Sequence, residues 1–274
     1  MKKFLLYVFL IGLGLTMVYP LLWLFFSSFK PNHEIFGSTA LLPKTWMLDS
    51  YIEGWKGSGQ FTFGVFFSNT FMLVLPTVFF TVVSSLLVGY GFSRFNFPFK
   101  KLFFTLMIST LMLPNTVIII PRYILFGKLG WVNSYLPFII PAIFACYPFF
   151  VYMMVQFIRG FPRDLDESAK IDGCSSFGIL VRIIMPLSKP AIVSAIIFQF
   201  LWTWNDFFNA MIYISSVKKY PISLALRMGL DSASKINWST VLAMSLVSMI
   251  PCILLFFFAQ KHFVEGVATT GIKS

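Results

Sequence analysis

The chain has 274 residues, of which 58% are hydrophobic, 19% are aromatic and only 11% are charged, and its mean hydropathy is +0.82. A soluble domain carries about 25% charged residues, so this composition excludes an ordinary soluble protein and indicates an integral membrane protein. The net charge of +11 does not indicate a nucleic-acid partner, because the basic residues lie singly in the segments between apolar runs. We expect a lipid bilayer, and no nucleic acid, around the chain.

The apolar runs predict six membrane spans, because a helix needs about 20 apolar residues to cross the hydrocarbon core. The first run, Phe4 to Phe26, is longer than the core of a signal peptide, so we expect it to stay as a span. The other five are expected at 69–91, 102–120, 136–157, 191–213 and 240–258. In the second span, Ser85 and Gly89 form either a chance pair or a small-x-x-x-small pair that lets a neighbouring helix approach closely.

Between these spans we expect loops, of which residues 30–68 form the longest and 121–133 and 214–237 form two others. The fourth span carries Pro137, Pro141 and Pro148. So many prolines suit either a helix that is broken where it lines a path or a helix with tolerated kinks.

Six spans place both termini on one side of the membrane. If that side is the cytoplasm, 12 of the 21 Lys and Arg residues lie inside and nine lie outside. The short turn 93–101 and the pair Lys2–Lys3 decide the assignment, because charges in short segments near span ends set the orientation.

The stretch 163–190 is a mixed-charge island in an otherwise nearly charge-free region. Its pattern predicts a short helix in which Asp166 and Lys170 pair at a spacing of four. Gly173 suits the end of this helix, because glycine adopts the left-handed conformation at little cost. The alternative is an ordinary solvated loop.

A second short helix is predicted after this glycine, capped by Ser175 or Ser176. An apolar stripe at i, i+3, i+4 and i+7 gives this helix one buried face; it consists of Phe177, Leu180, Val181 and Ile184. Pro186 and Pro190 end it before the next apolar run.

No residues suggest catalysis or a cofactor of the chain's own. Cys146, Cys174 and Cys252 have no metal or redox spacing, and His33 and His262 are isolated. We therefore expect no catalytic residue, no metal and no cofactor-binding residue. The phosphate-binding pattern G-x-x-x-x-G-K-[ST] is absent from the sequence, so ATP, if it is used, must be bound and hydrolysed by another chain.

Asp206 lies within the fifth apolar run, where an acid costs about 2.5–3.5 kcal/mol at a helix centre. Such a residue is a candidate functional site. We interpret a polar cluster around it as lining a translocation path; the cluster consists of Trp204, Asn205, Asp206 and Asn209. The alternative is an interfacial tryptophan belt with an acid that reaches the aqueous side.

The polar island resembles the EAA loop of ABC importer permeases. The resemblance rests on Glu167-Ser168-Ala169, on Asp172-Gly173, and on Ile183, Met185-Pro186-Leu187 and Pro190. It implies that the island is a coupling helix that docks into a cleft of a cytoplasmic ATPase. The implied ATPase-coupling residues are Asp166, Glu167, Ser168, Ala169, Asp172, Gly173 and Pro186.

Two further stretches resemble carbohydrate-importer permeases, in particular the smaller maltose-type permease. They are Trp202-Thr-Trp204-Asn205-Asp206-Phe207 and the tail, in which Gly266, Gly271 and Lys273 match the family ending and are implied to contact the ATPase. The implied fold is an all-α membrane protein with six transmembrane helices, the type I ABC importer permease bundle with a cytoplasmic coupling loop. It divides into 1–66 (first helix and extracytoplasmic loop), 67–260 (five-helix core with coupling loop 158–190) and 261–274 (cytoplasmic tail).

The resemblance implies a non-enzymatic subunit of an ATP-driven importer for a mono-, di- or oligosaccharide. Implied partners are a second related permease chain, a homodimeric or heterodimeric ATPase and an extracytoplasmic solute-binding protein. The implied location is the inner membrane of a bacterial or archaeal cell, with both termini cytoplasmic. The alternatives are an ATP-independent secondary transporter, an ABC permease for a polyol or glycerol phosphate, and a membrane-embedded enzyme.

Overall fold

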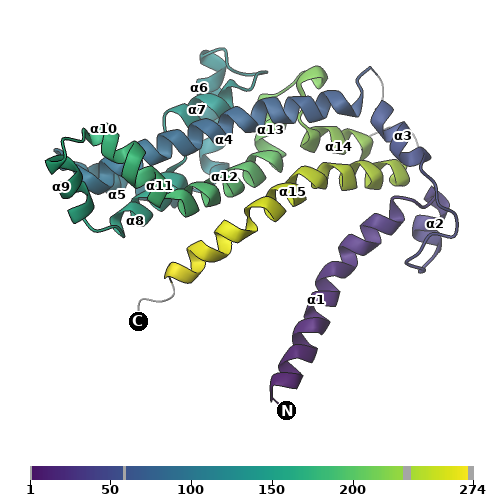
Figure 1. Cartoon of the computed structure of the whole chain (residues 1–274). Coiled ribbons are helices and arrows are strands. Elements are labelled where there is room, and N and C mark those ends of the chain that lie inside the picture. Colours follow the sequence, from purple (N-terminus) through teal and green to yellow (C-terminus); the bar gives the residue numbers. More distant parts are fainter. Residues whose placement is uncertain (1, 58–59, 231–235, 271–274) are drawn as a thin grey trace. The chain divides into compact units, whose positions relative to one another are not determined.

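The computed structural model describes residues 2–57, 60–230 and 236–270, with side chains for 3–57, 60–230 and 236–260. All regular structure in these residues is helical (Figure 1). In chain order the elements are α1 (Lys2–Ser27), α2 (Asn32–Gly37), α3 (Asp49–Lys56), α4 (Phe63–Arg94), α5 (Lys100–Leu111), α6 (Asn115–Lys128), α7 (Leu136–Ile143), α8 (Pro148–Arg159), α9 (Asp164–Ile171), α10 (Ser176–Ile179), the π-helix η1 (Leu180–Ile184), α11 (Met185–Leu187), α12 (Lys189–Trp204), α13 (Phe208–Tyr213), the 3₁₀-helix η2 (Val217–Lys219), α14 (Ile222–Leu230) and α15 (Trp238–Thr270).

Within the described residues, four segments are long and apolar enough to cross a membrane. They belong to α1, α4, the α7–α8 segment and α15. Two bent pairs bring the number to as many as six: α5 with α6, bent by 106°, and the α10–α11 segment with α12, bent by 76°. The number and order of the predicted spans therefore agree with the structure, while the ends of several differ.

The contacts divide the chain into two compact units, which we describe separately. Unit 1 contains residues 1–68 and 220–253, and unit 2 contains residues 69–219 and 254–274. The division at residues 66 and 260 that the sequence suggests stays a prediction.

In unit 1, Lys30 holds the long loop after α1 in place. Its side chain is only 1% exposed, and its Nζ donates a hydrogen bond to the Ala40 carbonyl at 2.5 Å. Its own carbonyl accepts a bond from Ser239 Oγ at 2.6 Å. The segment expected to be one loop therefore contains the short helices α2 and α3 and is fixed to the start of α15.

The predicted polar loop 214–237 is wrong for residues 222–230, which form α14. This helix buries Ile222, Leu224 and Ala225. These three residues stand at i, i+2 and i+3, and so short a pattern does not predict a helix among the charged residues of this segment.

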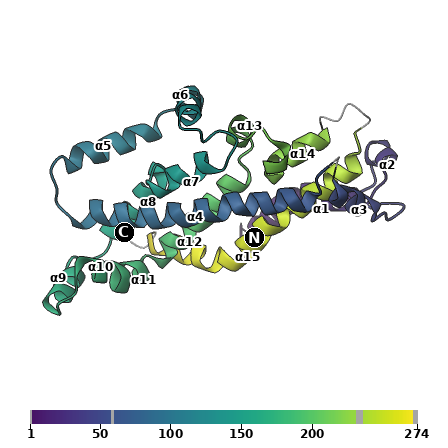
Figure 2. The ribbon, with the colours of Figure 1, turned by 90° about the horizontal axis from the view of Figure 1, so that it is seen from above.

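Most of α4 belongs to unit 2, and its 32 residues span about 48 Å at about 1.5 Å per residue. The hydrocarbon core is about 30 Å thick, so α4 extends beyond it. Figures 1 and 2 both show α9 and α10 at the Arg94 end of α4. This extension lets a membrane helix contact the polar island directly.

The close approach expected from the small pair in α4 is confirmed at Gly89. A Cβ atom there would lie 2.6 Å from Met154 Cβ and 3.3 Å from the Val155 backbone nitrogen. Ser85, one turn earlier, is 1% exposed. The absence of a side chain at Gly89 therefore lets α8 pack against the backbone of α4.

Two predicted boundaries in unit 2 are wrong. The loop expected at 121–133 is helical to Lys128, because α6 continues past Pro121 and buries Ile119 and Phe126. The fifth span does not continue to residue 213, because α12 ends at Trp204 and α13 begins at Phe208. Of the two alternatives for the prolines of the fourth span, a break and tolerated kinks, the structure shows a break, since α7 ends at Ile143 and α8 begins at Pro148.

Candidate functional site

The polar island begins with α9, whose first turn carries Asp164, Asp166 and Glu167 and whose last turn carries Lys170. Acidic residues near the start of a helix and basic residues near its end are favourable for the helix dipole. The helix ends before Gly173, which has φ +79°. The left-handed glycine predicted from the sequence is confirmed, and it turns the chain toward the next helix.

The predicted cap of the second helix is also confirmed, because Ser175 Oγ accepts the backbone N–H of Gly178 at 3.1 Å. The predicted apolar stripe is partly wrong: Phe177 is 68% exposed and Val181 is 39% exposed. The other two members of the stripe, Leu180 and Ile184 of the π-helix η1, are buried as predicted. Ile179 and Ile184, five apart, are both fully buried.

A buried ion pair fixes α9 to the end of α4. Arg94 Nε lies 2.8 Å from Asp166 Oδ2, with the side chains 7% and 10% exposed. The N–H is not aligned with that oxygen, so the contact is an ion pair without a directed hydrogen bond. Arg94 Nη2 also donates to the Phe161 carbonyl at 3.2 Å. The predicted Asp166–Lys170 pair is therefore wrong, because Asp166 points inward to α4.

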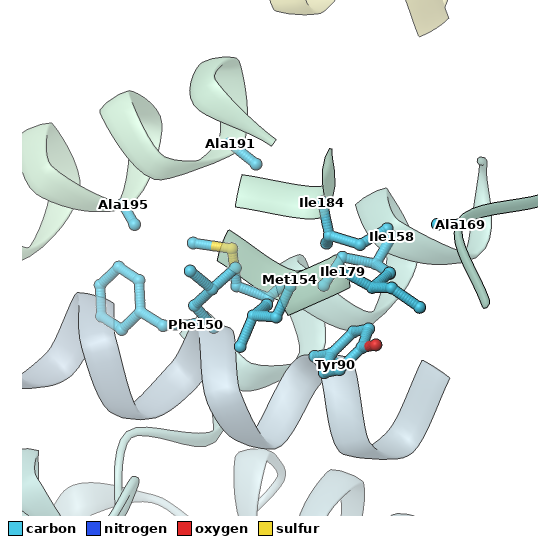
Figure 3. Packing of buried hydrophobic residues seen from close by; sticks show 11 residues of the cluster. Tyr90, Phe150, Met154, Ile158, Ala169, Ile179, Ile184, Ala191 and Ala195 are labelled. Carbon is cyan, nitrogen blue, oxygen red and sulfur yellow. The ribbon is translucent and has the colours of Figure 1, made fainter. Parts of the chain in front are cut away.

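The apolar side of the island packs into one hydrophobic cluster with the membrane helices (Figure 3). Tyr90 of α4 donates its hydroxyl to the Ser176 carbonyl at 3.1 Å, which adds a polar contact to the cluster. The buried members come from α4, α8, α9, α10, η1 and α12: Leu86, Tyr90, Phe150, Met154, Ile158, Ala169, Ile179, Leu180, Ile184, Ala191 and Ala195. Each fully buried aliphatic side chain contributes about 1.5–3 kcal/mol, so the island and these helices form one packed body.

The predicted coupling residues divide into two groups. Asp166 and Ala169 point inward, at 7% and 6% exposure, and hold α9 in place. The others lie on the outside of the island: Glu167, Ser168, Asp172, Gly173 and Pro186. Two apolar side chains of the island are also exposed: Ile171, at 86%, was not singled out in the sequence, and Phe177, at 68%, was predicted to be buried. The island thus exposes two apolar side chains, Ile171 and Phe177, which we call its apolar tip, together with the charged residues Glu167 and Asp172.

A second candidate site is a cavity of about 1090 Å³ in unit 2, lined from α6, α7, the start of α8, α12 and α13. Of the predicted path residues, Asn205, Asp206 and Asn209 line it. Trp204 does not: it is 3% exposed and its ring stacks on Phe200 at 5.2 Å. Trp202, two residues earlier, lines the cavity instead. Their role in a path stays a prediction.

Asp206 lies in the break between α12 and α13 and starts α13. Its Oδ1 accepts the backbone N–H of Asn209 at 3.0 Å, and the Asn209 side-chain amide donates to Oδ1 at 3.0 Å and to Oδ2 at 2.8 Å. Asn205 Nδ2 donates back to the Leu201 carbonyl at 2.8 Å. These side-chain bonds satisfy the backbone groups that a helix break leaves open.

The predicted tail contacts are only partly covered by the structure. Gly266 lies within α15, whereas Gly271 and Lys273 lie outside the described residues. As to metals, no three His, Cys, Asp or Glu side chains gather into a possible metal site in the part of the chain that the structure describes.

Residues 81–269 match the model of the family described as binding-protein-dependent transport system inner membrane component. The match covers more than half of the chain, so the protein belongs to this family of ABC importer permeases. Sequence and structure thus confirm the class expected from the EAA-like loop.

Among similar proteins, the probable ABC transporter permease protein YurM of Bacillus subtilis (strain 168) is 34% identical over 97% of this chain and 87% of its own. The arabinooligosaccharides transport system permease protein AraQ of the same organism is 33% identical over 97% of this chain and 94% of its own. A crystal structure of a bacterial ABC transporter that imports the acidic polysaccharide alginate matches with a TM-score of 0.84, at 20% identity, over 96% of both chains. That likeness confirms the predicted fold class.

Three features of these sites were not predicted: Arg94 as the partner of Asp166, Arg122 on the cavity wall and the exposed Ile171. Arg94 had one signal, since it lies just after a predicted span, in the basic turn 93–101, and therefore outside the lipid. Neither of the other two has a local signal, because their environments depend on elements distant in sequence.

Proposed function

We propose that this chain is the permease subunit of an ATP-driven importer that moves a sugar into the cell. Family membership supports the transport role. Relatives whose names specify arabinooligosaccharides and galactooligosaccharides, at 33% and 31% identity, support a mono-, di- or oligosaccharide as the substrate. Another relative, at 30% identity, is named for the uptake of osmoprotective compounds rather than of a sugar. A polyol or glycerol phosphate stays the alternative substrate.

The observation that carries coupling to an ATPase is the exposed apolar tip on a firmly packed island. Ile171 and Phe177 are 86% and 68% exposed, beside Glu167 and Asp172, on the island fixed to α4 by the Arg94–Asp166 pair. An apolar centre with a polar rim is the arrangement found at protein interfaces. A force applied to this tip would pass to α4, α8 and α12 through the buried cluster.

The mechanism that follows is a transmitted movement rather than chemistry on this chain. ATP closes an ATPase dimer and draws together the islands of this chain and of a related second permease. The packed helices then move as units and reverse the access of the substrate path. Such a switch needs an element with two states whose balance is shifted by a few kcal/mol.

The remaining parts of the proposal concern partners and orientation. ATP is bound and hydrolysed by a separate homodimeric or heterodimeric ATPase, and this chain holds no cofactor of its own. An extracytoplasmic solute-binding protein delivers the sugar. Both termini and the island face the cytoplasm of the cell, and residues of the α15 tail add contacts with the ATPase.

The test compares two substitutions at the exposed tip. Ile171→Asp should abolish co-purification of the ATPase and reduce uptake of labelled oligosaccharide at least tenfold, whereas Ile171→Leu, which stays apolar, should keep both. Because this side chain is 86% exposed, neither change should alter membrane insertion. Gly173→Pro and Glu167→Ala should uncouple uptake in the same way.

Other outcomes would change the conclusion. Normal uptake by Ile171→Asp and Gly173→Pro, with no ATPase in the purified sample, would favour an ATP-independent secondary transporter. A reporter fused after Lys189 that is active outside the cell would reverse the proposed orientation. Uptake of a polyol or glycerol phosphate, but of no saccharide, by complemented cells would replace the substrate.

A further inference from the structure

The cavity in unit 2 lies beside two interruptions of the helical backbone. The α7–α8 segment is interrupted at residues 144–147 and the α12–α13 segment at residues 205–207, and the cavity is lined by residues at or beside both breaks. Irregular backbone at membrane depth is tolerated where it is buried in protein or lines a water-filled cavity. The cavity volume of about 1090 Å³ is slightly above the range of about 300–1,000 Å³ of small-molecule sites.

The charged groups on the cavity wall balance each other. Among the described residues that line it, Arg122 and Asp206 are the only two with a charged side chain. Their charges sum to zero, so the cavity does not favour an ion of either sign. This balance suits an uncharged ligand with many polar groups.

The polar groups also combine acceptors with donors. The Asp206 carboxylate accepts three hydrogen bonds from Asn209, two at Oδ1 and one at Oδ2, at 2.8 to 3.0 Å, and a carboxylate has about four acceptor sites. Arg122 donates through Nη1 to Asn115 Oδ1 at 3.4 Å, and a guanidinium has five N–H donors. Hydroxyl groups, which both donate and accept, match such a wall.

An aromatic platform completes the lining. Trp202 is 51% exposed, and its ring is held by Phe149 and Phe150, with centroids at 5.1 Å and 5.2 Å. A fixed, half-exposed indole offers an apolar face together with one N–H donor. The C–H groups on one face of a sugar ring fit this surface, while the ring hydroxyls reach the polar groups.

We infer that this cavity is a binding site for neutral saccharide rings, with Trp202 as the apolar platform, Asp206 as acceptor and Arg122 as donor. The inference deepens the proposed sugar import, on which it rests, by placing part of the substrate contact on this chain. It also predicts that a saccharide with a carboxylate on each ring binds less well than its neutral counterpart.

Cys146 provides a direct readout, because it is exposed and lines the cavity. In the assembled transporter in membrane vesicles, the rate of Cys146 alkylation is measured by peptide mass spectrometry, with Cys174 and Cys252 as internal references. Saturating neutral pentose or hexose oligosaccharides should slow alkylation of Cys146 at least fivefold and leave the other two unchanged. The corresponding uronate oligosaccharides should protect less.

Two variants assign the protection to named groups. Trp202→Leu should raise the saccharide concentration needed for half protection at least tenfold, and Asp206→Leu should do the same. Trp202→Phe, which keeps an aromatic ring beside Phe149 and Phe150, is the matched control and should stay within about threefold. The amount of co-purified ATPase verifies that each variant assembles.

The outcomes separate this inference from the proposed function. Normal ATP-driven sugar uptake with no saccharide protection of Cys146 would overturn the inference and leave the importer intact. Protection without any uptake would support the site and overturn the importer. Equal or stronger protection by uronates would overturn the preference for neutral rings.

Discussion

The ion pair between Arg94 and Asp166 allows a quantitative test of how the island is held. Its side chains are 7% and 10% exposed, and the nitrogen–oxygen distance is 2.8 Å. Asp166→Asn keeps the shape of the side chain but leaves the guanidinium buried without a counter-charge. Removing one partner of a buried pair costs about 3–5 kcal/mol. We expect about 3 kcal/mol, because Arg94 keeps its bond to the Phe161 carbonyl.

The assay is hydrogen exchange of the α9 backbone amides in the purified transporter. A loss of about 3 kcal/mol in the free energy of local opening corresponds to about 100-fold faster exchange, since about 1.4 kcal/mol is a factor of ten. The amides of α1, which lies in unit 1, should exchange as in the wild type. The change should therefore be confined to the island and the elements packed against it.

Two further variants serve as controls. Arg94→Met combined with Asp166→Asn removes both charges, and replacing a buried pair by apolar groups is often neutral; this double variant should recover at least about 2 kcal/mol. Lys170→Gln removes the partner that the spacing of four suggests. Lys170 is exposed, so this change should cost about 0–0.5 kcal/mol.

The reasoning is refuted if Asp166→Asn exchanges at the wild-type rate, or if the effects of Arg94→Met and Asp166→Asn simply add. Either result would mean that the two charges do not stabilise each other. A large effect of Lys170→Gln would point instead to pairing within α9.

Three other predictions concern backbone geometry, each measured as the free energy of unfolding in detergent. Gly89→Ala should cost about 1–3 kcal/mol, because the added Cβ would lie 2.6 Å from a Cβ of α8. Gly91→Ala in the same helix should be neutral or stabilising, because nothing lies within 4 Å of its added Cβ. Equal costs for the two variants would contradict the packing of α8 against α4. Gly173→Ala should cost about 1–2 kcal/mol, and the cost should come from its φ of +79° alone, because no atom lies within 4 Å of the added Cβ. Gly173→Asn should cost less than Gly173→Ala. A larger cost for Asn than for Ala would contradict backbone strain as the cause. Asn133→Ala should cost about 2–4 kcal/mol, because Asn133 has φ 60° and its side chain accepts the backbone N–H groups of 215 and 216. Asn133→Asp, which keeps the acceptor, should retain most of that stability, and equal loss in both would contradict the assignment.

Local features of the sequence determined several parts of this protein without the fold. Composition established a membrane protein, because so few charged residues are compatible only with lipid surroundings. Gly173 and Ser175 determined how the two short helices of the island meet, since a left-handed glycine and an N-cap act within a few residues. The family pattern around Glu167 identified the class of protein for the same reason, because its residues lie within one loop.

Other parts depended on residues brought together from far apart. Spacing suggested Lys170 as the partner of Asp166, but the charge 72 positions earlier, Arg94, lies nearer in space. Phe177, which the apolar stripe predicts to be buried, is exposed because Ile179 is the α10 side chain that packs into the buried cluster.

The same limit applies to the cavity. A helical pattern through residues 191–213 did not reveal that Asp206 caps a new helix, nor that Trp202 faces the cavity while Trp204 is buried. Local propensities establish which segments fold and how each one begins and ends. Only the tertiary packing decides which charges pair and which side chains remain exposed, because burial depends on neighbours that the sequence places far away.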